Sequence, residues 1–138
     1  MDNNTKILIT SSTVNLAKVR DFIENKAKLA GFGVDIINQI VLSVDEACTN
    51  IIKHTYKFDD SHTIEISYHY ANAQFVVILK YKGDGFDPNT RNNPDMKEYF
   101  SKYRVGGLGI PLMKKFMDKI EFIHKNPDNN ILTLIKNV

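Results

Sequence analysis

The strongest constraint on the fold is the segment from Val34 to Tyr56, in which apolar residues recur every three or four positions. This spacing places the apolar side chains on one face of an α-helix. The apolar set keeps the period over several turns and consists of Ile37, Ile40, Val41, Val44, Ala47, Cys48, Ile51 and Ile52. The pattern therefore predicts a helix that crosses the core.

The length and composition indicate a single domain that covers residues 1–138. A chain of 138 residues buries about two thirds of the surface that its unfolded form exposes. Apolar residues make up 43% of the chain and charged residues 25%, which is typical of globular proteins. The formal net charge of +2, with scattered lysines and arginines, argues against direct binding of nucleic acid.

The longest apolar run, Phe75 to Leu79, is too short for a signal peptide or a membrane span. The single cysteine, Cys48, cannot form an internal disulfide and falls on the apolar side of the predicted helix. We therefore expect a cytoplasmic protein that is not bound to a membrane.

The other patterns along the chain predict five strands and two further helices. The expected strands are 6–10, 63–70, 74–81, 119–125 and 130–137, and the further helices lie within 14–30 and 106–118. The order is strand, helix, helix, strand, strand, helix, strand, strand. It predicts an α+β fold in which helices cover one face of a mostly antiparallel sheet.

Two polar residues, Glu46 and Asn50, lie one turn apart beside the apolar stripe of the central helix. Lys53 and His54 extend this polar strip by another turn. A solvated helix face is the ordinary interpretation of such a pair. A capping box formed by Ser43 and Glu46 is a second interpretation, but the apolar period begins well before Ser43.

Two glycine clusters bracket a long segment without a clear period. "KGDGFDP" (82–88) follows a strand and contains Gly83, Asp84 and Gly85. "GGLG" (106–109) precedes a helix and contains Gly107, Leu108 and Gly109. A glycine-rich turn at a helix N-terminus presents backbone N–H groups that suit phosphate oxygens. Each cluster alone is also compatible with an ordinary turn or a flexible helix start.

Taken together, these motifs resemble those of a known family. "DEACTNIIKHTY" (45–56) is similar to the N box of the GHKL ATPases, "GDGFDP" to their G1 box and "GGLGIPLMKKFMD" to their G2 box. The N box is particularly similar to that of the bacterial anti-sigma-factor serine-protein kinases. The resemblance implies the Bergerat fold, a two-layer α/β sandwich, with ATP and Mg²⁺ held between the N-box helix and a lid.

The resemblance also implies roles for individual residues. Asn50 would be the protein ligand of Mg²⁺, and Glu46 would be the catalytic base toward a serine hydroxyl. The implied nucleotide-binding residues are Asn50, Lys53, Gly83, Asp84, Gly85, Arg104, Gly107, Leu108 and Gly109. For the lid cations Lys102 and Arg104, a solvated loop is an equally good interpretation. The implied partners are a sigma factor, an anti-anti-sigma (STAS-type) protein and a second copy of the chain.

The sequence departs from the family pattern at one position. The aspartate that accepts a hydrogen bond from the adenine amino group in this family is replaced here by Tyr81. Two functions therefore remain open: an ATP-dependent serine-protein kinase, and a partner-switching module with weak or absent ATP binding. A histidine-kinase catalytic fragment fits less well, because 138 residues leave no room for a phosphoacceptor helical domain.

Overall fold

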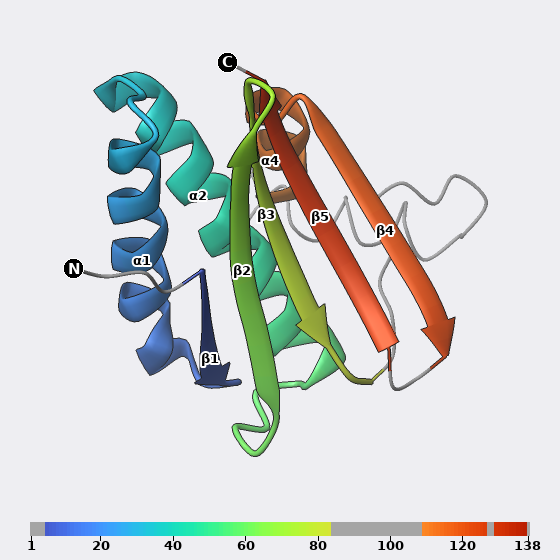
Figure 1. The fold of residues 1–138 in the computed structure, drawn as a ribbon. Coiled ribbons are helices and arrows are strands. Elements are labelled where there is room, and N and C mark those ends of the chain that lie inside the picture. The colour runs from blue at the N-terminus through green and yellow to red at the C-terminus, as the bar shows by residue number, and fades with distance from the viewer. Residues whose placement is uncertain (1–4, 84–108, 127–128, 138) are drawn as a thin grey trace.

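A computed structural model of the protein describes residues 5–83, 109–126 and 129–137 (Figure 1). The elements in chain order are β1 (Lys6–Thr10), η1 (Thr13–Asn15), α1 (Leu16–Leu29), α2 (Val34–Asn50), η2 (Ile51–Thr55), β2 (Thr63–Ala71), β3 (Gln74–Tyr81), α4 (Gly109–Phe116), β4 (Lys119–Asn126) and β5 (Asn129–Asn137). Their types and order agree with those predicted from the sequence.

The five strands form one sheet in the order β1-β2-β3-β5-β4, and every neighbouring pair is antiparallel. The β2–β3 hairpin turns through Asn72 and Ala73, whose φ angles are 54° and 60°. Two successive left-handed residues are the signature of the tight hairpin turn that matches the twist of a sheet. β5 lies beside β3 in the sheet. The end of β3 and the start of β5 therefore meet at one end of the sheet, where Tyr81 pairs with Asn130.

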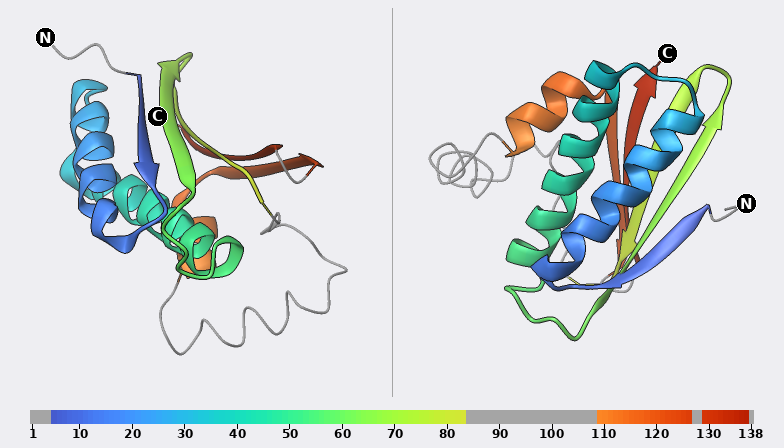
Figure 2. Two further views of the ribbon diagram at one scale, coloured as in Figure 1. Left: turned by 90° about the horizontal axis from the view of Figure 1, so that it is seen from below. Right: turned by 90° about the vertical axis from the view of Figure 1, so that its left-hand side faces the viewer.

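Helices α1, α2 and α4 lie on the same side of the sheet, as the two views of Figure 2 show. α2 packs against both α1 and α4, and it is the central element of the helical layer. This arrangement confirms the predicted two-layer α+β sandwich. Within the described part of the chain, no helix has the length and apolar character that a membrane crossing would require.

The core lies between the helical layer and the sheet. The predicted apolar face of α2 is buried almost throughout, although Val41 is only half-buried. Alternate residues of the strands meet this face, as their period of two requires. The apolar sheet residues that are completely buried are Ile64, Ile66, Phe75, Val77, Leu79 and Leu134.

The central helix changes its geometry just after Asn50. From Ile51 to Thr55 it forms a π-helical turn, which closes with a hydrogen bond from the Tyr56 N–H to the Ile51 carbonyl at 3.1 Å. The chain then leaves the helix through two left-handed residues, Lys57 and Phe58. Single π turns inside helices occur frequently at functional sites. Here the turn directly follows the N-box asparagine.

Candidate functional site

Glu46 and Asn50 lie one turn apart on α2, at the border of the core. The Glu46 side chain is half-buried, and burial raises the pKa of its carboxyl above the ordinary value. The neighbouring Asp45 raises this pKa further, while the positive charge of Lys53 opposes the shift. A carboxylate with a raised pKa is a stronger proton acceptor than an ordinary surface glutamate.

Asn50 is 8% exposed and therefore does not belong to a solvated helix face. Its Nδ2 atom is buried and has no hydrogen-bond partner among the residues that the structure describes. A buried amide without a partner costs about 1–3 kcal/mol, so such groups in folded proteins usually face a ligand or water. A half-turn of the amide would place Oδ1 in the same position.

Ser43 does not cap a helix. It lies in the middle of α2, where its hydroxyl donates to the Gln39 carbonyl one turn earlier at 2.8 Å. The capping-box interpretation of Ser43 and Glu46 is therefore wrong, because the helix already begins at Val34.

A small cavity lies beside Asn50, between the helical layer and the sheet. Its volume is about 10 Å³, which is about the space that one water molecule needs. The lining residues come from α2, η2, β3, α4 and β5 and are Ala47, Asn50, Ile51, Thr55, Tyr81, Met113 and Leu132. The lining is therefore mostly apolar, and it contains no carboxylate among these residues.

Tyr81 is the last residue of β3 and is 4% exposed. Its ring packs edge-on against the ring of Tyr56, with 6.4 Å between the centroids. The side chain thus points into the helix-facing layer, where it forms part of the cavity wall opposite α2. The position at which the GHKL pattern has an aspartate is occupied by a buried aromatic ring.

Position 83, two residues after β3, requires a glycine for two reasons. Its φ angle is +118°, a region that residues with a Cβ atom rarely adopt. A Cβ atom at this position would also lie 2.9 Å from the Cγ2 atom of Thr55. The first glycine of the "GDGF" motif therefore lets the chain pass close to the π turn.

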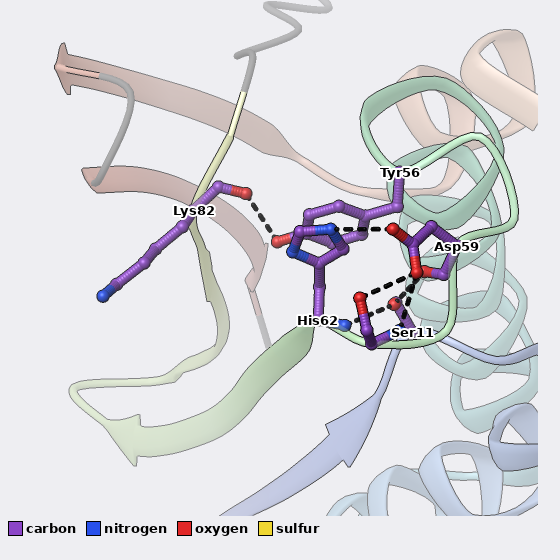
Figure 3. A network of polar contacts seen from close by, with 6 residues as sticks. Ser11, Tyr56, Asp59, His62 and Lys82 are labelled. Carbon is purple, nitrogen blue, oxygen red and sulfur yellow. Dashed lines mark hydrogen bonds and ion pairs between the residues drawn. The ribbon is translucent and has the colours of Figure 1, made fainter.

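A polar network that sequence reasoning missed surrounds this strand exit. The Tyr56 hydroxyl donates to the carbonyl of Lys82 at 2.5 Å, and its ring stacks on His62 (Figure 3). On the other side, the Asn130 amide donates to the carbonyls of Tyr81 and Gly83. Tyr56 belongs to the "DEACTNIIKHTY" motif, which was the available signal, whereas Asn130 lay in a segment that predicted only a turn and a strand.

His62 and Cys48 occupy structural positions. Among the residues that the structure describes, no group of three histidine, cysteine or acidic side chains could hold a metal ion. His62 instead packs on Tyr56 and pairs with Asp59, with 3.4 Å between Nε2 and Oδ2. Cys48 is completely buried, as predicted.

A family model described as the histidine kinase-like ATPase domain matches residues 9–136. The chain belongs to this family. It is similar to proteins named serine-protein kinase RsbW. The relative from Listeria innocua is 29% identical over 111 residues, and the alignment covers 78% of this chain and 71% of the relative. The relative from Bacillus subtilis is 31% identical over 107 residues, covering 74% of this chain and 66% of the relative. The relative from Halalkalibacterium halodurans is 30% identical over 122 residues, covering 86% and 73% respectively.

These matches confirm the GHKL resemblance that the three motifs indicated. Membership in the histidine kinase-like ATPase family also implies nucleotide binding. The α2 side of the site suits a metal–phosphate group, because an amide oxygen of Asn50 is a ligand type that Mg²⁺ prefers. The β3 side differs from the family pattern, because Tyr81 offers a neutral hydroxyl at the end of a longer side chain in place of the carboxylate that accepts from adenine.

Several residues predicted for this ATPase site cannot be placed. Asp84, Gly85, Lys102, Arg104, Gly107 and Leu108 lie outside the described residues. Gly109 is the first residue of α4, whereas the sequence pattern placed the glycine cluster before the helix. Lys53 lies in the π turn and is half-buried, close enough to Glu46 to oppose the rise in its pKa. The functional roles of all these residues remain predictions.

Proposed function

We propose that this chain is an ATP- and Mg²⁺-dependent serine-protein kinase of the anti-sigma-factor type. It would phosphorylate a serine on an anti-anti-sigma (STAS-type) protein and sequester a sigma factor. The observation that carries this proposal is the buried Nδ2 atom of Asn50, which has no hydrogen-bond partner among the described residues and lies one turn from Glu46. The similarity to proteins named serine-protein kinase supports the same reaction type.

Asn50 and Glu46 would have different roles in this reaction. When bound, Mg²⁺ supplies charge neutralisation at the phosphates, and the amide oxygen of Asn50 would be its ligand from the protein. Glu46 would orient the serine hydroxyl of the partner protein and accept its proton. Its raised pKa makes the carboxylate a better proton acceptor than an ordinary surface glutamate.

Lys53 would contribute positive charge to the same side of the site. It lies less than two turns from Glu46 on the continuous α2–η2 helix, and its charge already acts on that carboxyl. Phosphoryl transfer depends mainly on positioning and charge neutralisation, so a cation at this place suits the reaction.

A second function is favoured by one specific observation. The Tyr81 side chain is buried in the wall of a cavity that holds about one water molecule, where the family pattern provides an adenine-binding carboxylate. Under this alternative, the chain is a partner-switching module that binds its protein partners with little or no use of ATP.

The remaining parts of the proposal concern assembly and location. The similarity to RsbW proteins supports partners of the sigma-factor and anti-anti-sigma classes. A homodimer and a cytoplasmic location remain predictions from the sequence and its family resemblance.

A phosphotransfer assay separates the two functions. The purified chain is incubated with γ-labelled ATP, Mg²⁺ and candidate STAS-type proteins from the same genome. We expect label on a serine of one partner, and we expect Glu46→Gln to lose transfer while retaining ATP binding. Glu24→Gln, which changes a half-buried glutamate on α1, is the matched control and should transfer normally.

The opposite result would be equally informative. Stable complexes with a sigma factor and a STAS-type protein, without any transfer of label or binding of ATP, would contradict the kinase and support the partner-switching module.

A further inference from the structure

We propose that Tyr56 and Asn130 are positioning residues that hold the exit of β3, from Tyr81 to Gly83, against the end of the central helix. This inference rests on the proposed nucleotide site, because the held segment forms the wall of the cavity opposite Asn50. Neither side chain is among the residues that line this cavity.

Three consecutive carbonyl groups at the strand exit accept hydrogen bonds from these two side chains. The Asn130 amide nitrogen donates to the Tyr81 carbonyl at 3.2 Å and to the Gly83 carbonyl at 2.9 Å. The Tyr56 hydroxyl donates to the intervening Lys82 carbonyl at 2.5 Å. Successive carbonyls of an extended chain point in opposite directions, so donors are required on both sides. Tyr56 and Asn130 together therefore hold the strand exit from both sides, and we call this pair of residues the clamp.

The Asn130 half of the clamp is rigid because the amide is fully buried and held at both ends. Its nitrogen serves two carbonyls, so the Oδ1 atom must face the Nδ1 atom of His124, with which it makes a short contact. Since Oδ1 can only accept, Nδ1 carries the proton in this contact. The two carbonyls thereby fix which end of the amide points to the strand exit and which end faces His124.

The Tyr56 half is held by a second set of contacts, drawn in Figure 3. The Tyr56 ring stacks on His62 with 4.2 Å between the centroids and an interplanar angle of 8°. The loop that carries His62 is fixed by Ser11, whose hydroxyl donates to the Asp59 carbonyl and accepts from the His62 N–H. The turn after β1 thus supports the ring that reaches across to Lys82.

The clamp determines how the two walls of the cavity face each other. Gly83 already approaches Thr55 so closely that a Cβ atom would lie 2.9 Å from the threonine methyl group. Thr55, Asn50 and Tyr81 all line the cavity. A strand exit released from Tyr56 and Asn130 would move the Tyr81 wall relative to Asn50, and nucleotide affinity would fall.

The test uses one nearly isosteric variant in each half of the clamp. Tyr56→Phe keeps the stacked ring and removes the hydroxyl. Asn130→Asp keeps the shape and removes the N–H donor. The matched controls are Tyr70→Phe on β2 and Asn38→Asp on the exposed side of α2. Each protein is measured for the amide nitrogen shift of Gly83 without nucleotide, for thermal unfolding, and for the affinity for ATP and Mg²⁺.

We expect both clamp variants to shift the Gly83 signal, because the Lys82 and Gly83 carbonyls lose their donors. We expect Tyr56→Phe to weaken ATP binding about five-fold, the loss of one ordinary hydrogen bond. The controls should change neither quantity. A purely structural role would lower the unfolding temperature and leave the affinity unchanged.

An unchanged Gly83 signal in both clamp variants would overturn the clamp. A shifted signal with wild-type affinity for ATP would overturn its role in the nucleotide site. Failure of the wild-type chain to bind ATP would instead contradict the proposed kinase, and the Gly83 signal would still decide whether Tyr56 and Asn130 hold the strand exit.

Discussion

Asn50 and Tyr81 line the same cavity from its two sides, Asn50 from the central helix and Tyr81 from the end of β3. The residue that the GHKL resemblance implies as the Mg²⁺ ligand is therefore retained at the place where the residue implied to bind adenine has changed. Because the cavity holds about one water molecule, a purine base could occupy this place only if the lining, which includes the Tyr81 side chain, moved. The proposed kinase requires this movement, whereas the partner-switching module does not.

Replacement of Tyr81 by aspartate should increase the selectivity of the chain for ATP over GTP. The carboxylate can accept a hydrogen bond from the adenine amino group, which guanine lacks at that position. We expect at least a roughly ten-fold gain in the ratio of affinities, measured by calorimetric titration with both nucleotides.

Tyr81→Phe is the control for this variant, since it keeps the buried ring and adds no acceptor. Circular dichroism establishes that both variants are folded before the titration. Equal gains for Phe and Asp would contradict the explanation, because removal of the hydroxyl would then be sufficient.

The pKa of Glu46 predicts a pH dependence of stability. Burial raises its folded-state pKa above the ordinary value of 4.5, so the folded chain binds the proton more tightly than the unfolded chain. The stabilisation from this proton is fully present below pH 4.5 and is lost as the pH rises through the folded-state pKa.

Glu46→Gln cannot lose that proton. Its free energy of unfolding, relative to the wild type, should therefore increase between about pH 4 and pH 7, as measured by urea denaturation at several pH values. A difference that is constant or decreases over this range would show that the carboxyl is not held in a desolvated position.

Gly83→Ala should destabilise the fold by about 1–3 kcal/mol, because the side chain is incompatible with the left-handed backbone and meets Thr55. Combining it with Thr55→Ser removes the methyl group that is contacted and should recover part of the loss. A double-mutant cycle of unfolding free energies measures this recovery. Strict additivity of the two substitutions would contradict the close contact.

The Cys48 thiol should be unreactive in the native protein. Complete burial raises its pKa, and Asp45 raises it further, so the reactive thiolate is scarce. With a thiol reagent at about pH 8, we expect modification only after addition of denaturant. Rapid modification of the folded protein would contradict the placement of Cys48 in the core.

Much of the fold followed from local patterns in the sequence. The apolar period from Ile37 to Ile52 predicted the face of α2 that is buried, and alternation predicted the strands. The π turn after Asn50 could not be predicted, because the apolar spacing continues through it without interruption. The strand expected at 63–70 is one residue longer in the structure. Ala71 belongs to β2, and the β2–β3 hairpin turns through Asn72 and Ala73.

Only part of the candidate site could be predicted from the sequence, for a different physical reason. Glu46 and Asn50 are neighbours on one helix, so their spacing revealed their relationship. The contact of Tyr56 with Lys82 joins residues 26 positions apart, and that of Asn130 with Tyr81 joins residues 49 positions apart. Such contacts depend on the strand register, which no local period specifies.

The central claim is that Asn50 and its surroundings form a working site for ATP and Mg²⁺. The most direct measurement is calorimetric titration of the wild-type chain with ATP, with and without Mg²⁺, beside Asn50→Ala. We expect saturable binding that requires Mg²⁺ and is lost in the variant. Absence of binding by the wild type, or binding that Asn50→Ala leaves unchanged, would contradict the account.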